Sequence, residues 1–301
     1  MGIAASLVSH GYSTLMFDVR PQVYERARIY VKHALQELIA RAAFPAAILD
    51  GWGERLIDAG GLAEFGSCQF VIESVVEDLA TKTAVFEALE EVVGLDVPIA
   101  SNTSALPISV LQRSRKRPER FLGMHWNDPA YATRFLELIR GEMTSDAVFH
   151  AAAELALVLG KEPAFVQKDV PGFVANRMAY AMYREAVHLL ETGVADVETI
   201  DRAFQHSVGF WASFCGPLRW IDITGGPWLY AKAMQGVLPT LNNSTELPER
   251  LKQGYRSEER GVKDGRGFYS YKPGDLEHWE DLLREHAWHM RAAGRGSSPE
   301  S

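Results

Sequence analysis

The sequence predicts a doubly wound α/β domain followed by an all-helical domain. Short apolar runs of strand length alternate with helical segments through the first half of the chain, the pattern of a parallel sheet covered by helices. After Pro171-Gly172 the pattern is helical only. The 301 residues are 47% hydrophobic, which is enough for two domains. We therefore expect domains at residues 1–168 and 169–292 and a disordered tail at 293–301.

The individual elements follow from apolar runs and periodicity. In the first domain we expect helices at residues 2–10, 22–41, 79–93 and 145–159, where apolar side chains recur at helical spacing. We expect strands at residues 13–18, 69–74, 97–101, 121–125, 135–139 and near 164–167. In the second domain we expect long helices at residues 173–192 and 196–207.

Composition and charge argue against several classes of protein. The net charge of −8 argues against nonspecific binding of nucleic acid. No apolar stretch approaches the ~20 residues that a membrane span needs, and no signal peptide is visible. Cys68 and Cys215 match no metal or redox spacing. We therefore expect no metal site, no membrane or nucleic-acid partner, and a reducing, cytoplasmic location.

Asp18 ends the first apolar strand. A Rossmann-type, dinucleotide-binding fold places there the acid that holds the ribose hydroxyls, and a carboxylate at this point favours NAD over NADP because it repels a 2′-phosphate. The alternative is a turn or capping acid. The glycine loop that precedes this acid in the fold is not present, since the chain begins Met1-Gly2-Ile3-Ala4. We therefore expect the first strand to be missing, and interpret the sequence as an N-terminally truncated form of a longer enzyme.

Four motifs, taken together, resemble one family. They are Ser101-Asn102-Thr103-Ser104, Gly123-Met124-His125-Trp126-Asn127-Asp128-Pro129, Pro171-Gly172-Phe173-Val174-Ala175-Asn176-Arg177 and Gly265-Arg266-Gly267-Phe268-Tyr269. From Gly2 to about Tyr271 the chain resembles the L-3-hydroxyacyl-CoA dehydrogenases and their lambda-crystallin/L-gulonate dehydrogenase and carnitine dehydrogenase relatives. The resemblance implies NAD as cofactor and a homodimer formed through the helical domain.

His125 and Glu137 are the expected catalytic pair. Oxidation of a secondary alcohol needs a base for the hydroxyl proton, and an imidazole suits this role near neutral pH. His125 lies at the end of one expected strand, and Glu137 lies twelve residues later on the next. If these strands pair as a hairpin, the carboxylate reaches the imidazole, fixes its tautomer and stabilises its protonated form. The alternative for His125 is a structural histidine. The pair matches the His–Glu pair of the family.

The resemblance also implies roles for Ser104 and Asn176. Ser104 matches a serine that contacts substrate and nicotinamide, and its alternative role is a helix N-cap before Pro107. Asn176 matches an asparagine near the reacting oxygen of the substrate. It lies in the first turns of the second domain's long helix, so we expect the active site to fall between the domains. The alternative for Asn176 is a local amide contact.

Further residues match cofactor-binding positions of the family. Glu77 and Lys82 match a Glu and a Lys that flank NAD, with solvated helix-start charges as the alternative. Lys263 matches a lysine that reaches the cofactor from the second domain. Asp128 stands where the family usually has the asparagine of His-x-x-Asn-Pro, near the nicotinamide. Either this anion favours positive charge nearby, or Asn127 takes the role.

These residues predict hydride transfer between NAD and the 3-hydroxyl or 3-keto carbon of an acyl thioester. One alternative is a dehydrogenase of the same fold acting on a non-thioester hydroxy acid that resembles L-gulonate or carnitine. Another is a non-catalytic binding protein derived from the family. Arg26, Arg28, Lys32 and Arg41 could meet the phosphates of coenzyme A, or could form a solvated helix face.

Overall fold

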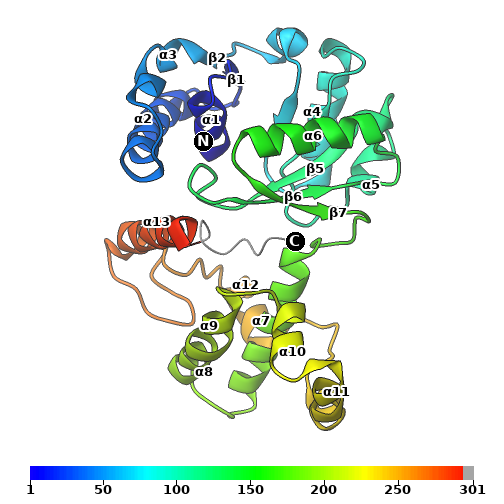
Figure 1. The fold of residues 1–301 in the computed structure, drawn as a ribbon, viewed down its shortest axis with the longest axis vertical. Helices are drawn as coiled ribbons and strands as arrows, with labels where there is room; N and C mark the ends of the chain where they lie inside the picture. The colour runs from blue at the N-terminus through cyan, green and yellow to red at the C-terminus, as the bar shows by residue number, and fades with distance from the viewer. Residues whose placement is uncertain (294–301) are drawn as a thin grey trace. The chain divides into compact units, whose positions relative to one another are not determined.

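The computed structural model describes residues 1–293, which fold into two compact units (Figure 1). Unit 1 comprises Met1–Arg177 together with Ala287–Arg291, and unit 2 includes Met178–His286. The tail expected at 293–301 lies outside the described residues, except for Ala293, which ends the last helix.

The strands of unit 1 form two sheets. One sheet pairs β1 with β2 in parallel, and the other has the order β3-β4-β5-β6-β7. Strands β3, β4 and β5 run parallel, β6 is antiparallel to β5, and β7 is parallel to β6. The bounds are β1 Thr14–Met16, β2 Leu56–Asp58, β3 Val71–Glu73, β4 Ile99–Ser101, β5 Phe121–Trp126, β6 Phe135–Ile139 and β7 Glu162–Val166.

The helices of unit 1 connect these strands. Their bounds are α1 Gly2–Ser9, α2 Gln22–Ala42, α3 Trp52–Arg55, α4 Leu79–Val92, α5 Ile108–Gln112, α6 Asp146–Val158 and the start of α7 Ala175–Glu191. The side chain of Asp78 caps α4 by accepting from the backbone N–H of Thr81 at 2.8 Å. Three short 3-10 turns lie at Ala46–Leu49, Leu62–Ser67 and Pro118–Arg120.

The five-stranded sheet is covered on both faces. Along β5, Leu122, Met124 and Trp126 pack in one apolar cluster with α6, whereas Phe121 packs in another with α4 and α5. Successive side chains of a strand point to opposite faces, so α6 covers one face and the pair α4 and α5 covers the other. Figure 1 shows α6 lying across β5, β6 and β7. By the same alternation, His125 shares the face of Phe121.

The sequence did not predict two features of unit 1. Strand β2 was missed because its three residues, Leu-Ile-Asp, are too short to show a period. The strands also divide into two sheets, where the sequence pattern indicated one. Helix α1 packs against both groups, because Ala5 and Val8 lie in the cluster of α2, whereas Ile3 and Leu7 pack against the cluster of α6.

Unit 2 is helical, as expected. Its elements are the rest of α7, α8 Val197–Ala203, a π-helical turn Phe204–Val208, α9 Gly209–Ala212, α10 Pro217–Ile223, α11 Gly226–Val237, a 3-10 turn Leu238–Thr240, α12 Glu249–Arg256 and most of α13 Asp275–Ala293. Within Met178–His286 only isolated bridges form, at Gly261, Arg266 and Ser270. Across residues 1–293, none of the helices combines the length and apolar content needed to cross a membrane.

Candidate active site

His125 and Glu137 face each other across the β5–β6 hairpin. The two residues are direct partners in the antiparallel register, so their side chains lie on the same face of the sheet. His125 Nδ1 lies 2.8 Å from Glu137 Oε2. The Glu137 side chain is 0% exposed and the His125 side chain is 15% exposed. The hairpin that the sequence predicted is therefore present, and it brings the carboxylate to the imidazole.

The second oxygen of Glu137 holds the start of α7. Glu137 Oε1 accepts the backbone N–H groups of Val174 and Ala175, each at 3.0 Å. The chain reaches this position through a turn at Gly172, whose φ of +77° favours glycine. Burial alone would raise the pKa of Glu137, but the bonds from His125 and the two amides hold that pKa below its usual value. Glu137 is therefore ionised, and it joins the imidazole to the first turn of the long helix.

Asn176 contacts the Ser104 loop within unit 1. Its amide nitrogen donates to the carbonyl oxygen of Ser104 at 2.9 Å. The Ser104 side chain is exposed, and α5 begins only at Ile108 with Pro107 as its N-cap residue. Ser104 does not cap that helix, so its hydroxyl stays open to a ligand. The structure thus brings together Ser104 with Asn176, and His125 with Glu137.

Glu77 holds the loop that carries Ser104. Its Oε1 accepts the hydroxyl of Thr103 at 2.5 Å and the backbone N–H groups of Ser104 and Ala105 at 3.0 Å each. Burial would raise the pKa of Glu77, but these bonds and the nearby Lys82 ammonium lower it instead. The carboxylate of Glu77 therefore fixes the backbone of this loop and is not simply a solvated charge.

Lys82 points inward. Its ammonium lies 2.8 Å from Glu73 Oε1 and 3.4 Å from Glu77 Oε2, and the side chain is 1% exposed. Glu73 Oε2 also accepts the hydroxyl of Ser101 at 2.6 Å. In this arrangement Lys82 contacts two carboxylates, Glu73 at the end of β3 and Glu77 in the segment that follows β3. Its predicted direct role at the cofactor remains a prediction.

Sequence reasoning gave no individual role to Glu73, Asn102 or Phe173, although the last two lie in the quoted motifs. Glu73 is an acid at the end of a strand, and that position was the signal that could have identified it. Asn102 Oδ1 accepts the backbone N–H of Trp126 at 2.9 Å, which ties the end of β4 to the end of β5. The buried ring of Phe173 lies with its centroid 6.0 Å from that of His125. These contacts join segments far apart in the chain.

Asp18 lies just beyond β1, and its carboxylate is engaged by Arg20. It accepts the backbone N–H of Arg20 at 2.9 Å and pairs with the guanidinium at 3.0 Å. The Arg20 guanidinium and backbone N–H lower the pKa of Asp18. The acid is thus ionised at the strand end where a ribose-binding carboxylate is expected.

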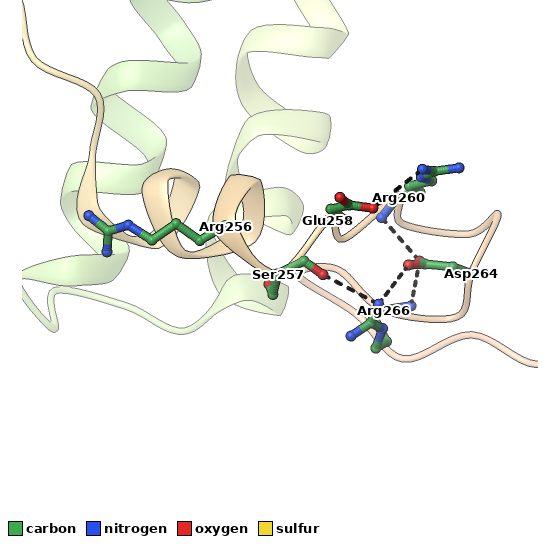
Figure 2. Close-up of a pocket in the computed structure, with 6 residues that line it drawn as sticks. All are labelled: Arg256, Ser257, Glu258, Arg260, Asp264 and Arg266. Atoms are coloured by element: carbon green, nitrogen blue, oxygen red, sulfur yellow. Dashed lines mark hydrogen bonds and ion pairs between the residues drawn. The ribbon is translucent and has the colours of Figure 1, made fainter.

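Asp128 and Lys263 are both exposed. Asp128 precedes Pro129 through a cis peptide bond in the loop that follows β5. Lys263 lies in unit 2, in a loop that also lines a pocket of about 440 Å³ (Figure 2). Figure 2 shows the Asp264 carboxylate held by the backbone of Arg260 and by Arg266, with bonds of 3.1 and 3.2 Å. The roles of Asp128 and Lys263 at the cofactor remain predictions.

The residues of unit 1 fit a nicotinamide dinucleotide. Parallel strands end together at one edge of a sheet, and that edge binds ligands in open α/β folds. The ends of β3, β4 and β5 bring the segments of Glu77, Ser104 and His125 to this edge. The roles predicted from the sequence, Asp18 at the ribose, Ser104 at the nicotinamide and Glu77 beside NAD, remain predictions.

Comparisons with known proteins support NAD as the cofactor. Residues 1–170 match the model of the 3-hydroxyacyl-CoA dehydrogenase NAD-binding domain, and residues 172–271 match that of the 3-hydroxyacyl-CoA dehydrogenase C-terminal domain. The chain is 35% identical over 274 residues to a 5-formyl-3-hydroxy-2-methylpyridine 4-carboxylate 5-dehydrogenase of Mesorhizobium japonicum, covering 90% of this chain and 87% of that enzyme.

Two solved structures are also similar. A 5-formyl-3-hydroxy-2-methylpyridine 4-carboxylic acid 5-dehydrogenase, described as an NAD⁺-dependent dismutase, matches with a TM-score of 0.88 and 31% identity, covering 100% of this chain and 95% of that one. An (S)-3-hydroxybutyryl-CoA dehydrogenase of Ralstonia eutropha matches with a TM-score of 0.74 and 30% identity, covering 90% and 94%. The chain therefore belongs to the 3-hydroxyacyl-CoA dehydrogenase family and is an enzyme that uses NAD.

Proposed function

We propose that this enzyme transfers a hydride between NAD and a carbon that bears a hydroxyl or carbonyl oxygen, with His125 as base and acid. The contact between His125 Nδ1 and Glu137 Oε2 at 2.8 Å carries the proposal. An ionised carboxylate can only accept hydrogen bonds, so the proton between the two groups belongs to Nδ1. The lone pair of Nε2 is then available to the substrate.

The reaction follows from this tautomer. In the oxidation direction, the substrate hydroxyl donates its proton to His125 Nε2, the hydride leaves the same carbon, and a carbonyl forms. When bound, NAD supplies the acceptor for the hydride. Glu137 stabilises the imidazolium that results, because its negative charge lies against Nδ1. One N–H of the Asn176 amide donates to the carbonyl oxygen of Ser104. The other N–H is a donor for the reacting oxygen of the substrate.

Two substrate classes fit this chemistry. The first is the 3-hydroxyl or 3-keto carbon of an acyl thioester, which the matched family domains support. The second is a non-thioester acid with a carbonyl group, as in the pyridine named for the Mesorhizobium relative. An aldehyde can react in the same way after it is hydrated, because one carbon of the hydrate bears both a hydroxyl group and the hydrogen that leaves as hydride.

We favour the non-thioester class for this chain. The pyridine-carboxylate dehydrogenase structure matches the whole chain, including the segment beyond residue 271, and does so with a higher TM-score than the hydroxybutyryl-CoA dehydrogenase. In addition, Arg28, one of the cations considered for coenzyme A phosphates, is engaged by the Asp58 carboxylate at 2.9 Å and by the Leu56 carbonyl at 3.1 Å. This leaves fewer open cations on α2 for a large phosphorylated carrier.

An assay of NADH absorbance tests the proposal. The enzyme is assayed with acetoacetyl-CoA, 5-formyl-3-hydroxy-2-methylpyridine 4-carboxylate, L-gulonate and carnitine. We expect turnover of the pyridine aldehyde to exceed that of the thioester. His125→Ala is expected to lower kcat by about 10²–10⁴, whereas His150→Ala, an exposed histidine of α6, should leave it unchanged. Preferred turnover of the thioester would support the first class, and binding of NADH without any turnover would support a non-catalytic protein.

The proposal includes a cytoplasmic homodimer. Unit 2 exposes large apolar side chains, with Phe210 72%, Leu218 78% and Trp228 74% exposed, and apolar surface of this kind is typical of an interface. Light scattering of the purified enzyme measures the oligomeric state. The two cysteines are free thiols, which suits a reducing compartment.

A further inference from the structure

The loop that follows His125 is held by two cations through four consecutive carbonyl groups. This loop, residues 127–134, joins β5 to β6 and so lies between the strands of the His125–Glu137 pair. The carbonyl oxygens of residues 130 and 133 accept from Lys161, and those of residues 131 and 132 accept from Arg291. Neither cation belongs to the site described above.

Lys161, the residue directly before β7, contacts the loop through two carbonyl groups. Its ammonium donates to the carbonyl of Ala130 and, at 2.6 Å, to that of Thr133. The residue is 4% exposed, and its ammonium lies 5.2 Å from the centroid of the Trp126 ring, the neighbour of His125. A buried amine needs hydrogen-bond partners in place of water, and the two carbonyl groups supply them.

Arg291 reaches the loop from the end of α13. Its guanidinium donates to the carbonyl of Ala132 at 2.9 Å and to that of Tyr131 at 3.2 Å. The neighbouring Trp288 is 4% exposed and packs edge-on against the ring of Tyr131, with centroids 6.0 Å apart. The last part of α13 is therefore built into the core of unit 1, although the matched family domains end at residue 271.

We propose that Arg291, together with Lys161, is a positioning residue that sets the place of His125 through the 130–133 loop; this rests on the proposed function. The loop begins two residues after His125 and ends shortly before Glu137, so a shift of its backbone changes the geometry of the pair. Ala130 and Ala132 are 2% and 0% exposed, so water cannot replace lost donors without the loop moving. Displacement of a catalytic group by about 1 Å is enough to slow a reaction strongly.

The test compares variants of Arg291 in the full-length enzyme. Arg291→Met removes the donors and the charge but keeps an unbranched side chain. Arg291→Lys keeps the charge, and His289→Ala is a control on the exposed side of the same helix. Rates are expressed per NADH-binding site, counted by fluorescence titration, so that loss of folded protein does not count as loss of kcat. Hydrogen exchange of the peptide spanning residues 127–134 reports on the loop directly.

We expect Arg291→Met to lower kcat about tenfold with the KM for NAD changed less than twofold, and to speed exchange in residues 127–134. Arg291→Lys should recover most of the rate, and His289→Ala should match the parent. If Arg291→Met does not fold, Arg291→Gln carries the same expectation. A folded variant with kcat within about twofold of the parent would overturn the proposal. If His125→Ala is as active as the parent, the proposed function fails. Unchanged exchange in Arg291→Met would separately refute the role of Arg291 in holding the loop.

Discussion

Replacement of Glu137 by glutamine separates the electrostatic role of this residue from its structural role. The carboxylate accepts three hydrogen bonds, from His125 Nδ1 at 2.8 Å and from the amides of Val174 and Ala175 at 3.0 Å each. In Glu137→Gln the amide oxygen can still accept the two backbone N–H groups. The amide NH₂ then faces Nδ1 and donates to it, which moves the imidazole proton to Nε2. The base is lost while the start of α7 stays anchored.

The size of the effect follows from this change of tautomer. Loss of a positioned general base lowers the rate by about 10²–10⁴, which corresponds to about 2.7–5.5 kcal/mol in the activation free energy. The free energy of unfolding at neutral pH should change much less, because the backbone bonds to α7 persist. The KM for NAD should stay near that of the parent, since Glu137 contacts neither the Ser104 loop nor Asp18 in the structure.

Stability in acid supplies a second measurement on the same variant. The folded chain holds the pKa of Glu137 below its unfolded value. The contribution of this residue to the free energy of unfolding is therefore present above the unfolded pKa and is lost as pH falls through the folded pKa. In denaturant titrations from neutral to acidic pH, the free energy of unfolding should therefore fall less in Glu137→Gln than in the parent. Glu142→Gln, an exposed carboxylate, is the control. A kcat for Glu137→Gln within about threefold of the parent would refute the reasoning.

Two further predictions concern Lys161 and Asp18. Burial and the nearby Arg291 lower the pKa of Lys161 from 10.5 to about 7, so the unfolded chain binds more protons between these values. The free energy of unfolding of the parent, relative to Lys161→Met, should then rise by up to about 1.4 kcal/mol per pH unit above pH ~7 and fall back as pH returns to that value. Urea titrations at several pH values measure this, and parallel pH curves would contradict it. Asp18→Ala should raise the KM for NAD about tenfold and improve relative use of NADP, as initial rates with both cofactors will show; unchanged cofactor preference would remove Asp18 from the ribose site.

Local pattern was sufficient to predict the fold class and the two strands that carry His125 and Glu137. The periods of strands and helices depend on residues close in sequence. The alternation of elements in unit 1 and the helical character of unit 2 could therefore be predicted from the apolar pattern. His125 and Glu137 are twelve positions apart on one hairpin, and the antiparallel register puts the two side chains face to face. Asp18 could be placed at a strand end for the same reason.

Only the tertiary structure decided the contacts between distant segments. The pairing of Arg291 with carbonyls about 160 positions earlier in the chain leaves no local trace, because hydrogen bonds to backbone oxygens impose no pattern on the residues that carry them. The Lys82 side chain points inward because it pairs with Glu73. The position of Glu73 at a strand end does not by itself predict this pairing. Sequence thus determined most of the elements, although not β2, and which side chains of the β5–β6 hairpin share a face. Packing in three dimensions determined which charges meet in the interior, where the loss of water makes each partner necessary.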